Sequence, residues 1–104
     1  MTTNTRTYDT ANYLTDDASI AAYLDEIMET GDPSLVSHAL GVVARAKGMS
    51  QIARDAGVSR ESLYRALSAD GNPEFSTVYK VIQALGMRLA VEPASAEHAE
   101  TPAA

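Results

Sequence analysis

The spacing Ala53-x-x-x-Gly57-Val58-Ser59-x-x-x-Leu63 limits the folds open to this chain more than any other feature of its sequence. Two helices that meet at a steep angle need a small residue where they touch, and Ala53 supplies one. The tight turn between them needs a positive φ, which Gly57 adopts at no steric cost. Val58 can then plug the turn into the core, Ser59 can cap the next helix, and Leu63 can pack that helix against the preceding one. The spacing therefore predicts a helix-turn-helix.

Five stretches carry apolar residues at helical spacing, so five helices are expected in all. Their approximate ranges are 17–30, 33–48, 49–56, 59–69 and 75–85. The short polar residues that can cap the first four are Asp16 or Asp17, Asp32, Ser50 and Ser59. Glu74 is a poorer cap for the fifth. The buried stripe of the second helix is expected to begin at Leu35 and that of the fifth at Phe75.

The pattern changes after Gly86, where apolar and polar or small residues alternate with a period of two, as is typical of a half-buried strand. The alternating residues are Met87, Arg88, Leu89, Ala90, Val91 and Glu92. Because nothing else in the chain looks like a strand, we expect the same strand of a second copy to pair with it in an antiparallel dimer ribbon. A helix face is the alternative dimer surface.

The chain has 104 residues, which gives room for one domain with a modest core. With one Phe and no Trp, that core must be aliphatic, and helices suit such residues better than a sandwich. The expected fold class is all-α, with five helices and a short C-terminal β-strand. We expect an N-terminal arm over 1–15, a helix-turn-helix domain with its dimerisation strand over 16–92, and a disordered tail over 93–104.

Several kinds of chemistry are excluded or disfavoured by composition. The chain has no Cys, so disulfides, thiolate metal sites and Cys nucleophiles are impossible. Its two His residues are isolated, there is no glycine-rich phosphate loop, and neighbouring acids fit caps and a solvated face better than acid–base catalysis. No apolar run approaches a membrane span, and the polar start has no signal-peptide core. We expect a cytoplasmic protein with no enzymatic activity, cofactor, metal or membrane partner.

The net charge of −6 argues against nucleic acid until its distribution is considered. Residues 1–44 hold seven acids and one base, whereas residues 45–88 hold seven bases and four acids, and three further Glu follow. An acidic front half and a basic middle suggest two partners of opposite charge.

The helix after the tight turn has one polar face. On a helical wheel, five side chains fall within an arc of roughly 140°. They are Arg60, Glu61, Tyr64, Arg65 and Ser68. In the major groove Arg binds guanine bidentately, Glu accepts from cytosine, and Tyr reaches a thymine methyl or a phosphate. This face is therefore predicted to read DNA, and the alternative is an ordinary solvated face.

Small polar residues near helix starts and in the following loop are candidates for phosphate contacts. They are Ser50, Gln51, Ser59, Asn72 and Thr77. For each of them plain capping or turn chemistry is the competing interpretation. Lys80 can contact a phosphate or remain solvated.

The run from Gly41 to Leu89 resembles a bacterial family, the probable addiction module antidote proteins. These are antitoxins with a lambda-repressor-like helix-turn-helix, related to the HigA type. The segments that carry the resemblance are Ala44-Arg45-Ala46-Lys47-Gly48-Met49-Ser50-Gln51-Ile52-Ala53, Gly57-Val58-Ser59-Arg60-Glu61-Ser62-Leu63-Tyr64-Arg65-Ala66-Leu67-Ser68 and Gly71-Asn72-Pro73. With Asp9-Thr10-Ala11 and Tyr23-Leu24 near the start, it spans about residues 8–92.

The resemblance implies a second partner, a small basic toxin of the RelE/ParE-like superfamily. The antitoxin would neutralise that toxin and, as a homodimer on double-stranded operator DNA, repress the promoter they share. The acidic front half fits such a toxin, and we assign its docking to Asp25, Glu26 and Glu29. Two alternatives remain open: a stand-alone or phage-derived repressor without a toxin, and a protein-interaction module that no longer reads DNA.

Overall fold

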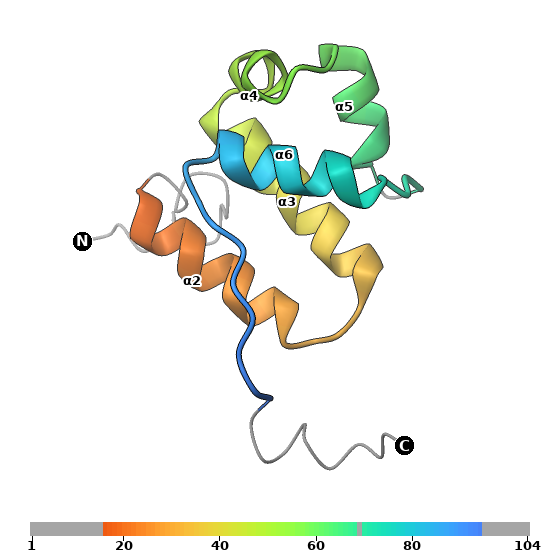
Figure 1. Ribbon diagram of the computed structural model, residues 1–104. Helices are drawn as coiled ribbons and strands as arrows, with labels where there is room; N and C mark the ends of the chain where they lie inside the picture. Colours follow the sequence, from red (N-terminus) through yellow and green to blue (C-terminus); the bar gives the residue numbers. More distant parts are fainter. Residues whose placement is uncertain (1–15, 69, 95–104) are drawn as a thin grey trace, which may run out of the picture.

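The computed structural model describes residues 16–68 and 70–94, and within them the chain forms five helices (Figure 1). They are α2 (Asp17–Met28), α3 (Pro33–Lys47), α4 (Met49–Ala56), α5 (Arg60–Ala66) and α6 (Phe75–Ala84). The predicted helical class and the number of helices are confirmed for this part of the chain. No described helix is long and apolar enough to cross a membrane. The expected arm over 1–15 and residues 95–104 of the expected tail lie outside the described residues.

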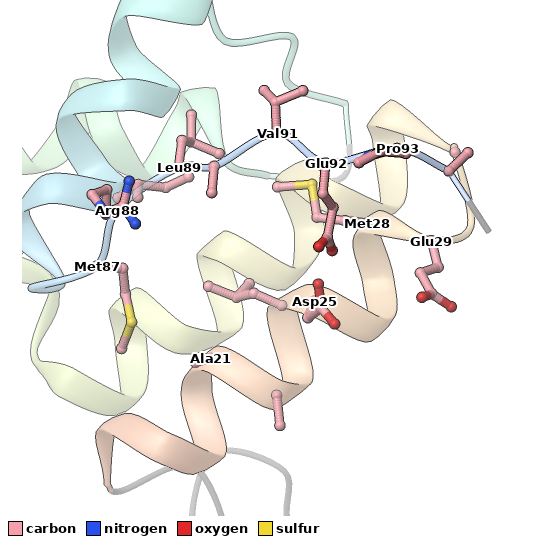
Figure 2. A pocket seen from close by; sticks show the side chains of 16 residues that line it. Ala21, Asp25, Met28, Glu29, Met87, Arg88, Leu89, Val91, Glu92 and Pro93 are labelled. Atoms are coloured by element: carbon pink, nitrogen blue, oxygen red, sulfur yellow. The ribbon is translucent and has the colours of Figure 1, made fainter.

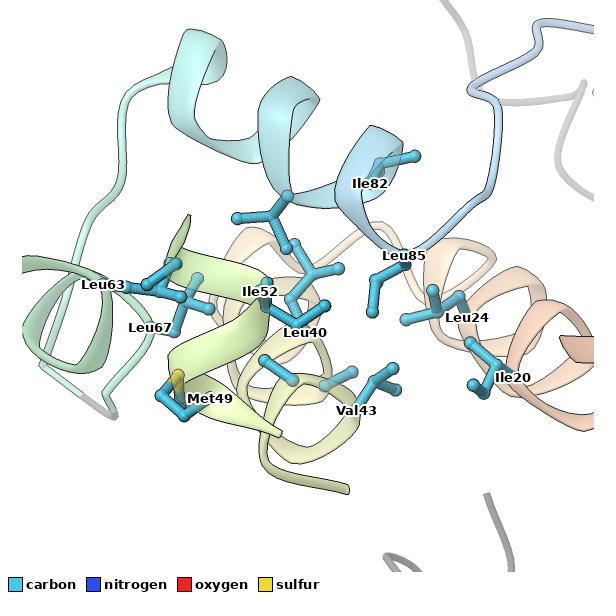
Figure 3. Packing of buried hydrophobic residues seen from close by; sticks show 14 residues of the cluster. Ile20, Leu24, Leu40, Val43, Met49, Ile52, Leu63, Leu67, Ile82 and Leu85 are labelled. Atoms are coloured by element: carbon cyan, nitrogen blue, oxygen red, sulfur yellow. The ribbon is translucent and has the colours of Figure 1, made fainter. Parts of the chain in front are cut away.

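The five helices enclose one aliphatic core. α3 contacts α2, α4 and α6, while α4 also contacts α5 and α6, so α3 and α4 form the centre of the domain. Figure 3 shows core side chains contributed by all five helices. The largest fully buried ones are Ile20, Leu40, Val43, Leu63, Leu67 and Val81. Because no aromatic side chain is among them, the core has the composition expected for this sequence.

Three predicted caps are present, and one is wrong. Asp16, Asp32 and Ser59 each accept a backbone N–H in the first turn of α2, α3 and α5. Ser50, however, lies inside α4 and does not cap it. The reason is that Gly48 joins two helices: its N–H donates to Ala44, and its carbonyl accepts from Ile52. A φ of +116° at this glycine makes the junction, which leaves no linker in which Ser50 could act as a cap.

The helix ends and the edge of the core also differ from expectation. α5 ends at Ala66, not near residue 69, and the Ser68 hydroxyl donates to the Arg65 carbonyl at 2.8 Å. Ser68 is thus part of the turn that ends α5 and does not extend its exposed face. Leu35 and Phe75, expected to be buried, are 40% and 70% exposed. Both lie in the first turn of a helix that begins beyond the edge of the core.

The predicted C-terminal strand is not seen among the described residues. After α6 the chain runs past α2 as an irregular segment, 87–94, without turning back (Figure 1). In this segment the structure gives one backbone hydrogen bond between described residues, from the Met87 N–H to the Ile82 carbonyl at 3.0 Å. A strand is defined by a ladder of hydrogen bonds with a neighbour, and the described part of the chain supplies no such neighbour.

Candidate nucleic-acid interface

α4 and α5 are joined by a tight turn of three residues. Gly57 takes the left-handed conformation, with φ +76° and ψ 28°, and so ends α4 as expected. The Val58 N–H donates to the Ala53 carbonyl at 3.0 Å, which folds the chain back. Ser59 then starts α5, because its Oγ accepts the Ser62 N–H at 3.0 Å. The left-handed glycine and the cap together fix the direction of α5 relative to α4.

The inner side of this helix pair is held by small and aliphatic residues. Ala53 is 2% exposed and Leu63 is 1% exposed, as the sequence spacing predicts. Val58 packs against the core at the turn. At its C-terminal end, α5 approaches α3 closely at Leu67, because Gly41 of α3 has no side chain to keep the Leu67 backbone away. α5 is therefore supported at both ends although it has only seven residues.

The outer side of α5 gathers four of the predicted site residues. Arg60, Glu61, Tyr64 and Arg65 are all exposed and together line one shallow, open hollow on the surface. Within residues 16–68 and 70–94, no hydrogen bond or ion pair involves the side chains of these four residues. The ion pair found in that part of the chain joins Lys47 to Asp17. Two guanidiniums, a carboxylate and a phenol thus face solvent from one short helix.

The other predicted DNA-contact residues do not line this hollow. Ser50 and Gln51 are exposed in the first turn of α4, where the Gln51 amide donates to both carboxylate oxygens of Asp55 at 3.1 Å. Asn72 is exposed in the loop before α6, and Thr77 is half-buried in the first turn of α6. The hydroxyl oxygen of Ser59 accepts the Ser62 N–H as the cap of α5. These residues are therefore separate polar positions outside the α5 hollow.

The acids proposed for toxin docking lie on a different part of the molecule. α4 and α5 are together at the top of Figure 1, whereas α2 lies toward the bottom. Asp25 and Glu29 line a groove between α2 and segment 87–94, as Figure 2 shows. Glu26 is exposed on α2 but does not line this groove. The structure therefore brings together two of the three acids.

One surface feature was missed from the sequence. Phe75 and Tyr79 stack on each other at the start of α6, with ring centroids 6.0 Å apart and planes at 29°. Both are exposed. The signal available was their spacing of four residues, which places two aromatic rings on the same side of a helix.

The described part of the chain has no group of three or more acids or histidines arranged to hold a metal ion. The α5 face, in contrast, exposes hydrogen-bond donors and acceptors to solvent. Such a face is suited to contacting another molecule.

Over residues 16–68 and 70–94 the fold and this face define an all-helical protein that presents a short helix, packed on its inner side, to solvent. A family model described as "probable addiction module antidote protein" matches residues 4–93. The chain therefore belongs to the family of probable addiction module antidote proteins. The name of the family indicates an antitoxin role and a toxin partner of some kind.

A relative in Haemophilus influenzae (strain ATCC 51907 / DSM 11121 / KW20 / Rd) is 50% identical over 92 residues, which is 88% of this chain and 95% of the relative. That relative is described as an uncharacterized protein. No solved structure matches the chain.

Proposed function

We propose that this protein is the antitoxin of a type II toxin–antitoxin module and represses its own operon by binding operator DNA. In this proposal α4 and α5 act as a lambda-repressor-like helix-turn-helix of the HigA type within a domain spanning 16–92. The observation that carries it is the outer side of α5, where four exposed side chains without partners among the described residues stand on a helix fixed by Gly57 and Ser59.

α5 occupies the position of a recognition helix, which lies in the major groove while the preceding helix crosses the backbone. Arg60 and Arg65 present planar guanidiniums that suit the O6 and N7 acceptors of guanine. Glu61 can accept from a cytosine amino group, and Tyr64 can reach a thymine methyl or a phosphate. These contacts would supply the specificity.

Phosphate contacts would fix the orientation of the protein on the duplex and supply much of the affinity. Ser50 and Gln51 lie at the start of α4, which precedes α5 in the chain. Asn72 and Thr77 follow α5, in the next loop and in the first turn of α6. Gln51 would exchange its hydrogen bonds to Asp55 for one to a phosphate, so its net contribution should be small. Because residues 45–88 have a net charge of +3 in a chain of −6, binding should weaken steeply with salt.

The toxin partner is proposed to be RelE/ParE-like and basic, and to dock on the acids of α2. Asp25 and Glu29 line one groove and would make the closest contacts, while Glu26 would contribute its charge from outside it. Because α2 and the α5 face lie on different parts of the domain, DNA and toxin need not compete. A ternary complex of antitoxin, toxin and operator follows from this separation.

Two experiments test the proposal. The purified protein should bind a labelled duplex taken from upstream of its own gene more tightly than a scrambled duplex of the same length. In cells, it should restore growth arrested by a RelE/ParE-like toxin expressed from a gene adjacent to its own. Specific DNA binding without rescue would make it a stand-alone repressor, and rescue without DNA binding would make it an interaction module. Failure of both would overturn the proposal.

A further inference from the structure

Segment 87–94 leaves the end of α6 with its side chains divided between two sides. Met87 and Leu89 are half-buried against the core, and Val91, two residues further on, is 99% exposed. Arg88 and Glu92 are exposed. Figure 2 shows this segment passing α2, where Met28, itself 37% exposed, lies near Glu92. The apolar row of this segment therefore begins against the core and ends, at Val91, without cover from the described residues.

We propose that residues 87–93 pair with the same residues of a second copy as an antiparallel ribbon whose two-fold axis passes through Ala90. This inference rests on the homodimer expected for an operator-binding antitoxin, and it adds the register, the residue pairs and the edge that is used.

The sequence of the segment is self-complementary in this register. With the axis at Ala90, Leu89 faces Val91 of the second copy, and Arg88 faces Glu92 of the second copy. Each pair occurs twice because of the symmetry. Cross-strand apolar pairs and opposite charges stabilise an antiparallel ribbon, and Val91 gains the apolar cover it lacks.

Neighbouring registers lose this match. If the axis moves to Leu89, Arg88 faces Ala90, and if it moves to Val91, Arg88 faces Ala94. Shifts of half a residue would set side chains from opposite faces against each other, so they give no symmetric antiparallel pair. The Ala90 register is thus favoured over its neighbours by side-chain chemistry alone.

The backbone supports the same register through its donors. In an antiparallel pair the N–H groups of alternate residues point toward the partner strand, and those between them point away. If Ala90 forms a hydrogen-bonded pair with its own copy, then Arg88 and Glu92 also point toward the partner, whereas Met87 and Pro93 point away. The Met87 N–H is already donated to Ile82 at 3.0 Å, and Pro93 has no N–H to donate. Both sites without a free donor therefore fall where the ribbon needs none.

The charges of the segment favour a second copy over the toxin as the occupant. A strand from a basic toxin would be attracted by Glu92 and repelled by Arg88, two unlike charges only four residues apart. A second copy run antiparallel satisfies both charges at once.

Cross-linking tests the register in the full-length chain, which contains no Cys. In the Ala90→Cys variant, the two Cα atoms of a hydrogen-bonded pair would lie about 5.5 Å apart. A short bis-maleimide should therefore join the two copies. The matched control is Ala94→Cys, whose symmetry mates would lie about 26 Å apart along the ribbon. We expect a covalent dimer from Ala90→Cys and at most a tenth as much from Ala94→Cys.

A charge exchange tests the pairing of Arg88 with Glu92. Arg88→Glu and Glu92→Arg each place like charges opposite one another, so each should raise the dimer dissociation constant roughly tenfold. The double variant restores opposite charges and should return the constant to within about threefold of the parent value. If the dissociation constant of the double variant rose by as much as the two single increases combined, the pairing of Arg88 with Glu92 would be wrong.

The outcomes separate this inference from the proposed function. A dimer by analytical ultracentrifugation that does not cross-link at Ala90 overturns the register and leaves the homodimer. A monomer overturns both the ribbon and the homodimer. Cross-linking between Ala90→Cys and an added toxin, in place of a second copy, assigns the segment to the toxin and also overturns the ribbon. None of these measurements includes DNA, so DNA binding by α5 is judged separately.

Discussion

Gly41, in the middle of α3, lies so close to Leu67 at the end of α5 that a Cβ built on the glycine would stand 2.9 Å from the Leu67 carbonyl oxygen. The atom it would meet is backbone, which cannot move aside as the tip of a flexible side chain can. The central helix therefore sets how closely the C-terminal end of α5 can approach. The orientation of the proposed DNA-reading face depends on this contact between two helices far apart in sequence.

Gly41→Ala is expected to destabilise the protein, although alanine is the better helix former. The helix-propensity gain is about 1 kcal/mol, whereas overpacking against backbone costs about 1–3 kcal/mol and would displace the end of α5. Urea denaturation measures the net effect. The control is His38→Ala, at an exposed position in the same helix. If Gly41→Ala proved as stable as the control, the close contact would have no energetic consequence.

Ser59→Ala should remove the cap of α5 and lower the free energy of unfolding by about 1 kcal/mol. The matched control is Ser62→Ala in the same helix, because Ser62 contributes only its backbone N–H to the cap at 3.0 Å. Ser62→Ala should therefore be neutral or slightly stabilising. Thermal or urea unfolding compares the two variants, and equal effects would show that the hydroxyl of Ser59 is not needed to start the helix.

Asp16 should make the stability of α2 depend on pH. Hydrogen bonds from the side chain and backbone N–H of Ser19 hold the pKa of Asp16 below its ordinary value of 3.8. A carboxyl group whose pKa is lowered on folding stabilises the fold above its unfolded pKa, and this contribution is lost as pH falls through the folded pKa. Asp16→Asn keeps an acceptor but cannot titrate. The stability difference between parent and variant should therefore shrink between pH 5 and pH 2, and a constant difference would exclude the carboxylate.

The groove acids should control how fast a basic toxin associates. Replacing Asp25 and Glu29 with Asn and Gln should slow association most at low salt, because a long-range field is screened as salt rises. Glu26→Gln, outside the groove, is the control and should have the smaller effect. Stopped-flow mixing at two salt concentrations measures the rates. A rate insensitive to both mutation and salt would exclude electrostatic docking on α2.

The features that the sequence predicted well are local ones. The cap by Ser59 and the left-handed turn at Gly57 depend on a few neighbouring residues, so spacing alone was enough to place them. The exposed face of α5 followed from its helical period. Its length did not: α5 ends at Ala66, and the N–H and hydroxyl of Ser68 both donate to the Arg65 carbonyl in the turn that follows.

The features that were missed depend on more distant parts of the molecule. Periodicity gave the face on which Phe75 lies but not how far the core extends, and Phe75 is exposed because α6 begins beyond it. The approach of Gly41 to Leu67 involves two helices whose distance no local pattern reports. Alternation from Met87 to Val91 is a real pattern, but a strand also needs a neighbour, and the described residues of one chain do not supply it.

The central claim is that α5 reads DNA, and fluorescence anisotropy on a duplex from upstream of the gene tests it most directly. Arg60→Ala and Arg65→Ala should each cost about 1–3 kcal/mol of the preference for this duplex over a scrambled one, because each removes a bidentate contact to a base. The fold should stay intact because both side chains are exposed. Lys47→Gln also removes one positive charge, but from a side chain that pairs with Asp17 of α2 at 3.4 Å, so it serves as the control. The account predicts a loss for both Arg variants and little change for the control. Parental affinity in both Arg variants would contradict it.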